Sequence, residues 1–293
     1  MPKRIPFICF LITLAVGSAA VPAFGQALLP HPLQLDSTQM EKTGLSIAEE
    51  AAQLARFRQY ELALPRAELA TQLAPKSFQT WALLGSLYIQ TEELEKGVAA
   101  LQQAQNLDPE NASILFALGS ARFQQENYAA AIQELQAGLK LKPNVPGALF
   151  DLGNAYYKLN QFPQAIAEYE KAYAQEKNFW PAINNIGLVN YEKGDTEGAI
   201  QRWKTAVSID DKAAEPMLAL AVALYTKGDR EQGLAMGEAA LKLDSRYGDI
   251  EFLKENLWGE RLLQDTQKFL ETPRIQASLA QNQDAPTPPV MSP

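Results

Sequence analysis

The chain has 293 residues and a formal net charge of −8, from 34 acidic and 26 basic side chains, and 47% of its residues are hydrophobic. That hydrophobic share is ordinary for a globular protein, so a wholly disordered or fibrous chain is excluded, and the negative charge opposes binding to a nucleic-acid backbone. A single cysteine, Cys9, and a single histidine, His31, exclude an internal disulfide, a multi-thiolate zinc site and Ser–His or Cys–His catalysis. The composition therefore favours a binding protein over an enzyme, and we expect no cofactor and no metal.

The N-terminal segment, residues 1–25, begins with two basic residues, continues as an apolar run and ends in small residues. This order is typical of an export signal, here with a cleavage site after Gly25. The charge-free run is also long enough for an uncleaved membrane anchor, which needs about 20 residues. Both interpretations stay open, and residues 26–43 are then a linker.

A period of 34 residues divides the chain from Gly44 to Tyr247 into six blocks without insertion or deletion. Small residues recur at positions 8, 20 and 27 of the blocks. The eighth position reads Ala51, Gly85, Gly119, Gly153, Gly187 and Ala221. Apolar residues in each block follow the spacing of two amphipathic helices, and small residues let two helices approach closely. Each block therefore predicts an antiparallel helix pair, and the six blocks predict an all-α solenoid.

These blocks resemble the tetratricopeptide repeat (TPR), which has Leu-Gly at positions 7 and 8, Tyr at 11, Ala at 20 and 27, and Pro at 32. The second block supplies Trp81, Leu84, Gly85, Tyr88, Gly97, Ala104 and Pro109. The first block departs most, with Glu50 at position 7. The resemblance covers residues 44–247 and implies a non-enzymatic TPR α-solenoid with a polypeptide partner.

The residues after the blocks divide into two predicted parts. An apolar stripe at Ile250, Leu253 and Leu257 predicts a capping helix within residues 248–271, which would cover the last repeat. Residues 272–293 hold five prolines and little apolar content, so a disordered tail is predicted there.

In TPR proteins the first helix of each repeat lines a concave groove, mainly through positions 2, 5, 9 and 12. Carried over by this resemblance, the candidate groove residues are Phe116, Phe123, Phe150, Asn154, Tyr157, Asn184, Tyr191 and Tyr225. Aromatic rings bury much area with little loss of rotamer freedom, and asparagine amides pair with a peptide backbone, so this surface suits an extended or helical segment. The alternative, that these side chains only pack the repeats together, stays open.

One function known in the family is not expected. Co-chaperone TPR domains hold a C-terminal carboxylate with basic side chains, at positions where this chain has Phe150, Glu215 and Ala219. Without a cation there, a carboxylate would lose its charge-assisted partners. We therefore do not expect a chaperone-tail clamp.

The layout of apolar N-terminus, six repeats and Pro-rich tail resembles the TPR proteins of cyanobacterial and chloroplast membranes that aid photosystem and pigment assembly, including one that interacts with protochlorophyllide oxidoreductase. The resemblance implies a scaffold at a thylakoid or plasma membrane, whose partner is a chlorophyll-synthesis or photosystem assembly protein. An exported periplasmic or lumenal module for envelope biogenesis is the alternative, and self-association through the open edge of the array is a third hypothesis.

Overall fold

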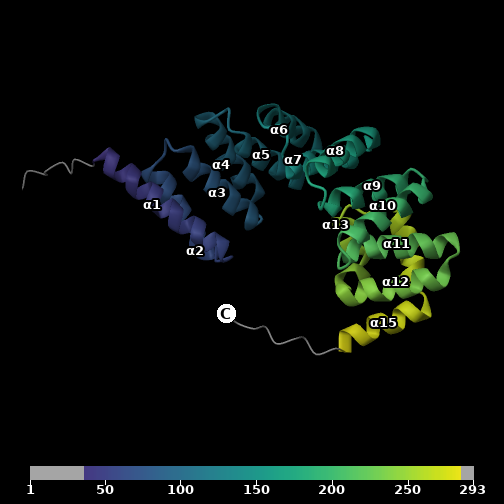
Figure 1. Ribbon diagram of the computed structural model, residues 1–293. Coiled ribbons are helices and arrows are strands. Elements are labelled where there is room, and N and C mark those ends of the chain that lie inside the picture. The colour runs from purple at the N-terminus through teal and green to yellow at the C-terminus, as the bar shows by residue number, and fades with distance from the viewer. Residues whose placement is uncertain (1–35, 285–293) are drawn as a thin grey trace, which may run out of the picture. The chain divides into compact units, whose positions relative to one another are not determined.

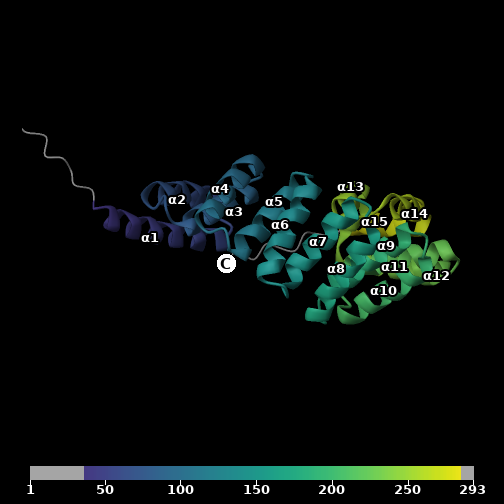
Figure 2. The same ribbon diagram turned by 90° about the horizontal axis from the view of Figure 1, so that it is seen from above.

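Six antiparallel helix pairs follow one another in the computed structural model, which describes residues 36–284 (Figures 1 and 2). The first three pairs are α1 (Ser37–Arg56) with α2 (Tyr60–Leu73), α3 (Phe78–Gln90) with α4 (Leu94–Leu107), and α5 (Ala112–Gln124) with α6 (Tyr128–Leu141). The next three are α7 (Pro146–Lys158) with α8 (Phe162–Gln175), α9 (Trp180–Glu192) with α10 (Thr196–Ile209), and α11 (Ala214–Lys227) with α12 (Arg230–Leu243). Each helix packs against its partner, and consecutive pairs pack against each other, which confirms the predicted all-α solenoid.

The 34-residue register agrees with the helix boundaries. In repeats 2 to 6 the first helix begins on the first residue of its block. Repeat 1 differs, because α1 begins at Ser37, well before Gly44. The residues between them contain no Pro or Gly and include good helix formers, so the helix extends backwards into the predicted linker. The linker, expected over residues 26–43, therefore does not reach beyond residue 36.

The turn inside every pair has one residue in the left-handed backbone region. These residues all occupy position 15 of their blocks and have φ between 56° and 119°: Arg58, Glu92, Glu126, Asn160, Gly194 and Gly228. The residue that follows donates its N–H to a carbonyl in the last turn of the first helix, as Asp229 does to Leu224 at 2.9 Å. This is the pattern of a Schellman ending, which satisfies carbonyls that the helix end leaves free. The turn is therefore set by backbone geometry, which even non-glycine residues adopt here.

Small residues at position 8 allow the two helices of a repeat to touch. A Cβ atom on Gly153 would lie 2.5 Å from the ring of Tyr169, and one on Gly187 would lie 2.5 Å from Trp203. Both rings come from the second helix of the same repeat and are fully buried. The glycine thus makes the space that a large core side chain fills.

The predicted capping helix over residues 248–271 is divided into shorter elements: η1 (Ser245–Gly248), α13 (Ile250–Glu255) and α14 (Glu260–Leu270). Leu257 lies in the break between α13 and α14 with φ 66°, a conformation that an α-helix cannot contain. The chain changes direction there. Helix α14 therefore does not continue the array of repeats.

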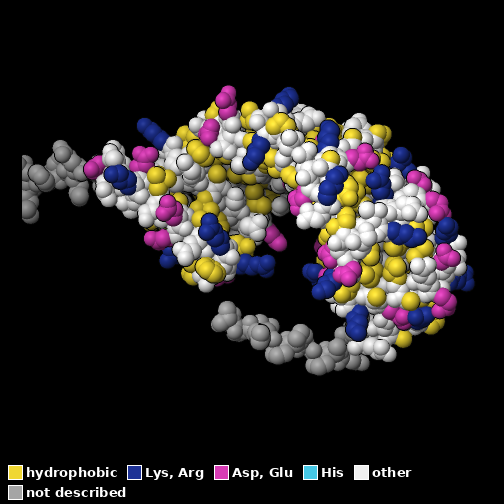
Figure 3. Space-filling view, in the orientation of Figure 1, with side chains coloured by type: hydrophobic (Ala, Val, Ile, Leu, Met, Phe, Trp, Pro, Cys, Tyr) yellow, Lys and Arg dark blue, Asp and Glu magenta, His cyan; other side chains and the backbone are white. Residues whose placement is uncertain are grey.

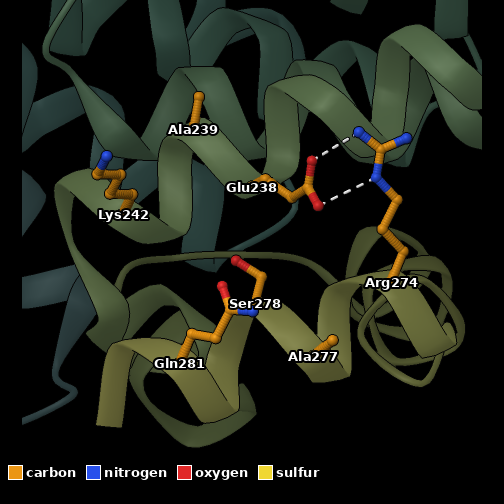
Figure 4. A pocket seen from close by; sticks show the side chains of 7 residues that line it. All are labelled: Glu238, Ala239, Lys242, Arg274, Ala277, Ser278 and Gln281. Atoms are coloured by element: carbon orange, nitrogen blue, oxygen red, sulfur yellow. Dashed lines mark hydrogen bonds and ion pairs between the residues drawn. The ribbon is translucent and has the colours of Figure 1, made fainter. Parts of the chain in front are cut away.

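The last helix, α15 (Pro273–Asp284), lies where disorder is predicted for residues 272–293. Ile275 is fully buried, and Arg274 pairs with Glu238 at 2.7 Å (Figure 4). Arg274 also pairs with Glu231 at 3.0 Å, and these contacts hold α15 against α12. The prediction of disorder is wrong for residues 273–284, and the rest of that tail lies outside the described residues. The first helical position suits Pro273, because its missing N–H would have no partner there.

Candidate functional site: the inner face of the repeats

The first helices of successive repeats form the inner face of the array. Contacts join α1 to α3, α3 to α5 and α5 to α7, so the first helices of repeats 1 to 4 lie side by side. Figure 3 shows hydrophobic side chains on the hollowed inner side near α3 and α5. This is the surface on which the candidate groove residues are expected.

Three candidate aromatics, Phe116, Phe123 and Phe150, are partly exposed on α5 and α7. Each also packs against the chain's own residues. A Cβ atom on Gly138 of α6 would lie 2.5 Å from Phe116, and the ring centroid of Phe123 lies 5.2 Å from that of Tyr128. Phe150 lies 5.3 Å from Phe179 and 5.7 Å from Tyr169. These rings thus hold the repeats together with part of their surface and leave the remainder open, and their role in partner binding stays a prediction.

Asn154 and Tyr157, the candidates next along α7, are buried. Asn154 Oδ1 accepts hydrogen bonds from the Tyr169 hydroxyl at 2.8 Å and from Asn185 Nδ2 at 3.0 Å. Tyr157 packs against Phe162, and burial raises the pKa of its hydroxyl well above the usual value. The carbonyl oxygen of Asn154 therefore bonds to this chain's own donors, where the sequence predicted pairing with a partner's backbone.

Asn184 extends this polar row on α9. It is 1% exposed, and its Nδ2 donates to Asn185 Oδ1 at 3.1 Å. Its Oδ1 has no hydrogen-bond partner, alone among the buried side-chain polar atoms of residues 36–284. Asn184 is therefore enclosed, and it does not face an open groove as predicted.

Tyr191 and Tyr225, the last two candidates, face α14. Tyr191 is fully buried, and its hydroxyl donates to Asp265 at 2.7 Å, while the Tyr225 ring lies 5.3 Å from Phe269. Both were predicted to face a partner. In the structure they contact the C-terminal part of the same chain, which folds back onto the repeats. The repeat pattern does not predict this contact.

The segment from residue 250 to residue 270, which we call the C-terminal segment, covers the inner face of repeats 5 and 6. Its helix α14 contacts both α9 and α11, the first helices of those repeats. As a result, every residue from 182 to 189 of α9 is buried. In α3, by contrast, the buried residues are confined to Thr80, Leu84, Gly85 and Leu87. Within residues 36–284 the segment leaves the inner face of repeats 1 to 3 and most of repeat 4 uncovered, and Leu257 packs in the apolar cluster that contains Tyr157 of repeat 4.

Polar contacts fix the start of α14 on α9. The carboxylate of Glu192 accepts the backbone N–H groups of Arg261 at 3.1 Å and Leu262 at 3.0 Å, so it caps α14 from another helix. Arg261 also donates to the backbone oxygen of Tyr191 at 2.9 Å. A Cβ atom on Gly259 would overlap Glu192, which explains the glycine before α14. Sequence reasoning missed this docking, because only the apolar stripe of the segment was visible.

Trp258 and Glu215 make the central contact of the segment. Trp258 is 4% exposed, and its Nε1 donates to Glu215 Oε1 at 3.2 Å. Burial raises the pKa of Glu215 to about 7, although hydrogen bonds from Asn184 and Trp258 lower it in part. Burial also raises the pKa of Asp151, whose carboxylate accepts from the Ser120 hydroxyl at 2.8 Å. The inner wall of repeats 4 to 6 thus carries two desolvated carboxyl groups.

No group of three or more His, Cys, Asp or Glu side chains in residues 36–284 is arranged to hold a metal ion. None of the helices there has both the length and the apolar character needed to cross a membrane. The predicted signal or anchor, residues 1–25, lies outside the described residues.

Family models identify the repeats. The TPR repeat model matches residues 85–125, 119–160 and 187–228, and a tetratricopeptide repeat model matches residues 146–179. No curated protein matches the chain. The chain therefore contains tetratricopeptide repeats, as the sequence pattern predicted.

Solved structures share the fold. A crystal structure of MamA is 26% identical with a TM-score of 0.52, over 56% of this chain and 96% of that one. The Pseudomonas aeruginosa pilF structure is 18% identical with a TM-score of 0.61, over 75% of this chain and 98% of that one. YrrB, described as a TPR protein with an unusual peptide-binding site, is 19% identical with a TM-score of 0.52, over 66% and 97%.

Proposed function

We propose that this TPR α-solenoid is a protein-interaction scaffold that holds a polypeptide segment on the open inner face of repeats 1 to 4. The observation that carries the proposal is the difference between the two halves of the inner face. Repeats 5 and 6 are filled by the C-terminal segment, whereas α5 and α7 keep Phe116, Phe123 and Phe150 partly exposed. Partly exposed aromatic rings on a concave surface are typical anchors for a peptide or helix. The described peptide-binding site of YrrB supports the same class of partner.

A pair of matched substitutions tests this proposal. Ser86 is exposed on α3, at position 9 of its repeat, and Gln102 is exposed on α4, the second helix of the same repeat. Ser86→Arg should block the inner face, whereas Gln102→Arg adds the same charge elsewhere. With the full chain as bait, proteins captured from native membranes and identified by mass spectrometry should be lost with Ser86→Arg and kept with Gln102→Arg. Equal capture by both variants, with unchanged helix content, would contradict partner binding on the open inner face.

The scaffold works at a membrane in this proposal, through the charge-free N-terminal run. Retention of Met1 in the membrane fraction, seen by intact-mass measurement, is the result expected for an anchor. A mature chain that starts at Gln26 would instead support the alternative, an exported periplasmic or lumenal module for envelope biogenesis.

A narrower role follows from the layout of the chain, which resembles photosynthetic TPR proteins. In that role the partner is a photosystem assembly protein or a chlorophyll-synthesis enzyme at the thylakoid. The capture experiment above tests it directly, because the narrower role requires such proteins among those lost with Ser86→Arg. Capture of envelope proteins alone would contradict it.

A further inference from the structure

Two polar side chains lie on the inner face of repeats 5 and 6, beneath Trp258. Glu215, on α11, accepts a hydrogen bond from the Trp258 indole at 3.2 Å, and the Asn184 side chain on α9 lowers the pKa of its carboxyl group. Because Asn184 belongs to repeat 5 and Glu215 to repeat 6, the pair bridges the two repeats. We call it the Glu215–Asn184 pair.

The C-terminal segment leaves this pair short of donors. Asn184 Oδ1 has no hydrogen-bond partner although the residue is 1% exposed. In the described part of the chain, the ion pairs formed by Lys and Arg side chains do not include Glu215. A buried acceptor without a donor and a desolvated carboxylate without a cation both cost free energy. An ionised carboxylate with no cation beside it is what a Lys ammonium or an Arg guanidinium would pair with.

The apolar contacts of the segment, in contrast, are well made. Trp258, Leu262 and Phe269 are buried in the same cluster as Leu218 and Val222 of α11. The inner face of repeats 5 and 6 is thus shaped for an amphipathic helix. The resident helix fits the apolar part of this face and does not match its polar part.

The turn before α14 also carries a backbone cost. Leu257 adopts φ 66°, which is unfavourable for a residue with a branched side chain, and α13 before it is only six residues long. Strained backbone of this kind persists where its surroundings compensate for it. The resident segment is therefore held by a balance of good apolar contacts against polar and backbone costs.

We propose that the inner face of repeats 5 and 6 is a second binding site, for a partner segment that presents a Lys or Arg to the Glu215–Asn184 pair at the start of an amphipathic helix, and that the C-terminal segment occupies this site until such a partner displaces it. This proposal rests on the scaffold function and adds a partner chemistry to it. The basic residue supplies the donors that the Trp258 indole does not.

Labelled peptides with the sequence of residues 250–270 provide the probes. One carries Trp258→Arg, and its matched control carries Trp258→Gln, so that the two differ in charge at the contact with Glu215. The host is the full chain with Arg261→Ala, which removes the hydrogen bonds of Arg261 to Tyr191 and Thr196 and weakens the resident segment. Binding is measured by fluorescence anisotropy at about pH 8, where Glu215 is ionised because its pKa is about 7.

The Arg peptide is expected to bind the host about tenfold more tightly than the Gln peptide. The preference should vanish in the host that also carries Glu215→Gln, and it should fall at about pH 5.5, where Glu215 takes up a proton. Tyr247 of η1 is the neighbouring titratable group, and burial raises its pKa so that it stays neutral at both pH values. Equal binding of the two peptides, a preference that survives Glu215→Gln, or no binding of either would overturn the proposal.

A further variant separates this site from the open groove. Ser86→Arg in the same host should leave binding of both peptides unchanged, because Ser86 lies in repeat 2. Loss of membrane-protein capture with retained peptide binding would support both sites. Failure of the peptide preference alone would remove the second site and leave the scaffold proposal standing.

Discussion

The hydroxyl of Tyr191 on α9 donates a hydrogen bond to Asp265 on α14 at 2.7 Å, across 74 residues of chain. The guanidinium of Arg261 lies 4.8 Å from the centre of the same tyrosine ring, so α14 contacts both the hydroxyl and the ring of Tyr191. This contact connects the fifth repeat to a helix outside the repeats. It explains why a residue with the sequence pattern of a groove aromatic is fully buried.

Tyr191→Phe should loosen the C-terminal segment without unfolding the repeats. The ring still fills its site, but the Asp265 carboxylate, 17% exposed, loses its donor and keeps only the ion pair with Lys268 at 3.5 Å. We expect a loss of about 1–2 kcal/mol. Amide hydrogen exchange in α14 should become faster by about tenfold, while circular dichroism is unchanged. Tyr225→Phe is the control, because the Tyr225 contact with Phe269 is made by the ring. Equal exchange rates in Tyr191→Phe and the parent chain would contradict the contact.

The titration of Glu215 should make the free energy of unfolding depend on pH. Its pKa is raised from 4.5 to about 7, so between these values the folded state holds a proton that the unfolded state has released. The resulting stabilisation is fully present below about pH 4.5 and is lost as the pH rises through 7. The free energy of unfolding should therefore fall by up to about 3 kcal/mol across that window.

Urea unfolding at a series of pH values measures this change. Glu215→Gln should flatten the fall, because glutamine cannot titrate, and the variant should be more stable than the parent chain at about pH 8. Asp151 also has a raised pKa and contributes in the same direction, so Asp151→Asn is the matched comparison. An unchanged slope in Glu215→Gln would show that this carboxylate is not desolvated in solution.

The sequence predicts the repeats well because each repeat touches mainly its neighbours. A fixed period then repeats the same contacts, such as Gly153 with Tyr169 and Gly187 with Trp203, and small residues appear in columns. The inner face is different. Contacts such as Trp258 with Glu215 join a repeat to a segment outside the period, so they occur once and leave no column. For this reason the groove was predicted to run through repeats 5 and 6, where the structure shows it filled.

The tail shows a second limit of the sequence pattern. Its prolines cluster after residue 285, apart from Pro273, which opens α15. An average over the whole tail therefore hid a helix whose Ile275 and Leu279 are spaced to face α12 and η1. The buried position of Ile275 confirms the spacing as the signal that composition obscured.

Substitutions of Gly228 and Gly147 distinguish the effect of backbone conformation on stability from the effect of packing. A Cβ atom would have open space at both Gly228 and Gly147, but Gly228 has φ 119° in the turn of repeat 6, whereas Gly147 lies in the first turn of α7. Gly228→Ala should destabilise the chain by about 1–2 kcal/mol, since alanine avoids positive φ. Gly147→Ala should be neutral or stabilise the chain by up to about 1 kcal/mol, because alanine lowers the conformational entropy of the unfolded chain. Thermal unfolding of both variants is the measurement, and equal melting temperatures would contradict the left-handed turn.

The docking of α15 on α12 can be divided into its apolar and its charged parts. Ile275 is fully buried, and a Cβ atom on Gly237 of α12 would lie 3.4 Å from it. Ile275→Ala should therefore cost about 2–4 kcal/mol at this interface. Arg274, beside it, pairs with Glu238 (Figure 4) and also with Glu231, in an exposed setting. Arg274→Ala should cost less than about 1 kcal/mol, because water screens such pairs.

Hydrogen exchange resolved to α15 distinguishes the two substitutions. Ile275→Ala should expose the α15 amides while α9 and α11 stay protected, since the repeats do not depend on this last helix for their own pairing. Arg274→Ala should leave protection of α15 close to that of the parent chain, and added salt should have little effect on it. If Arg274→Ala released α15 and Ile275→Ala did not, the ion pairs would hold the helix on α12. That result would contradict the apolar contact of Ile275 as the main source of its docking.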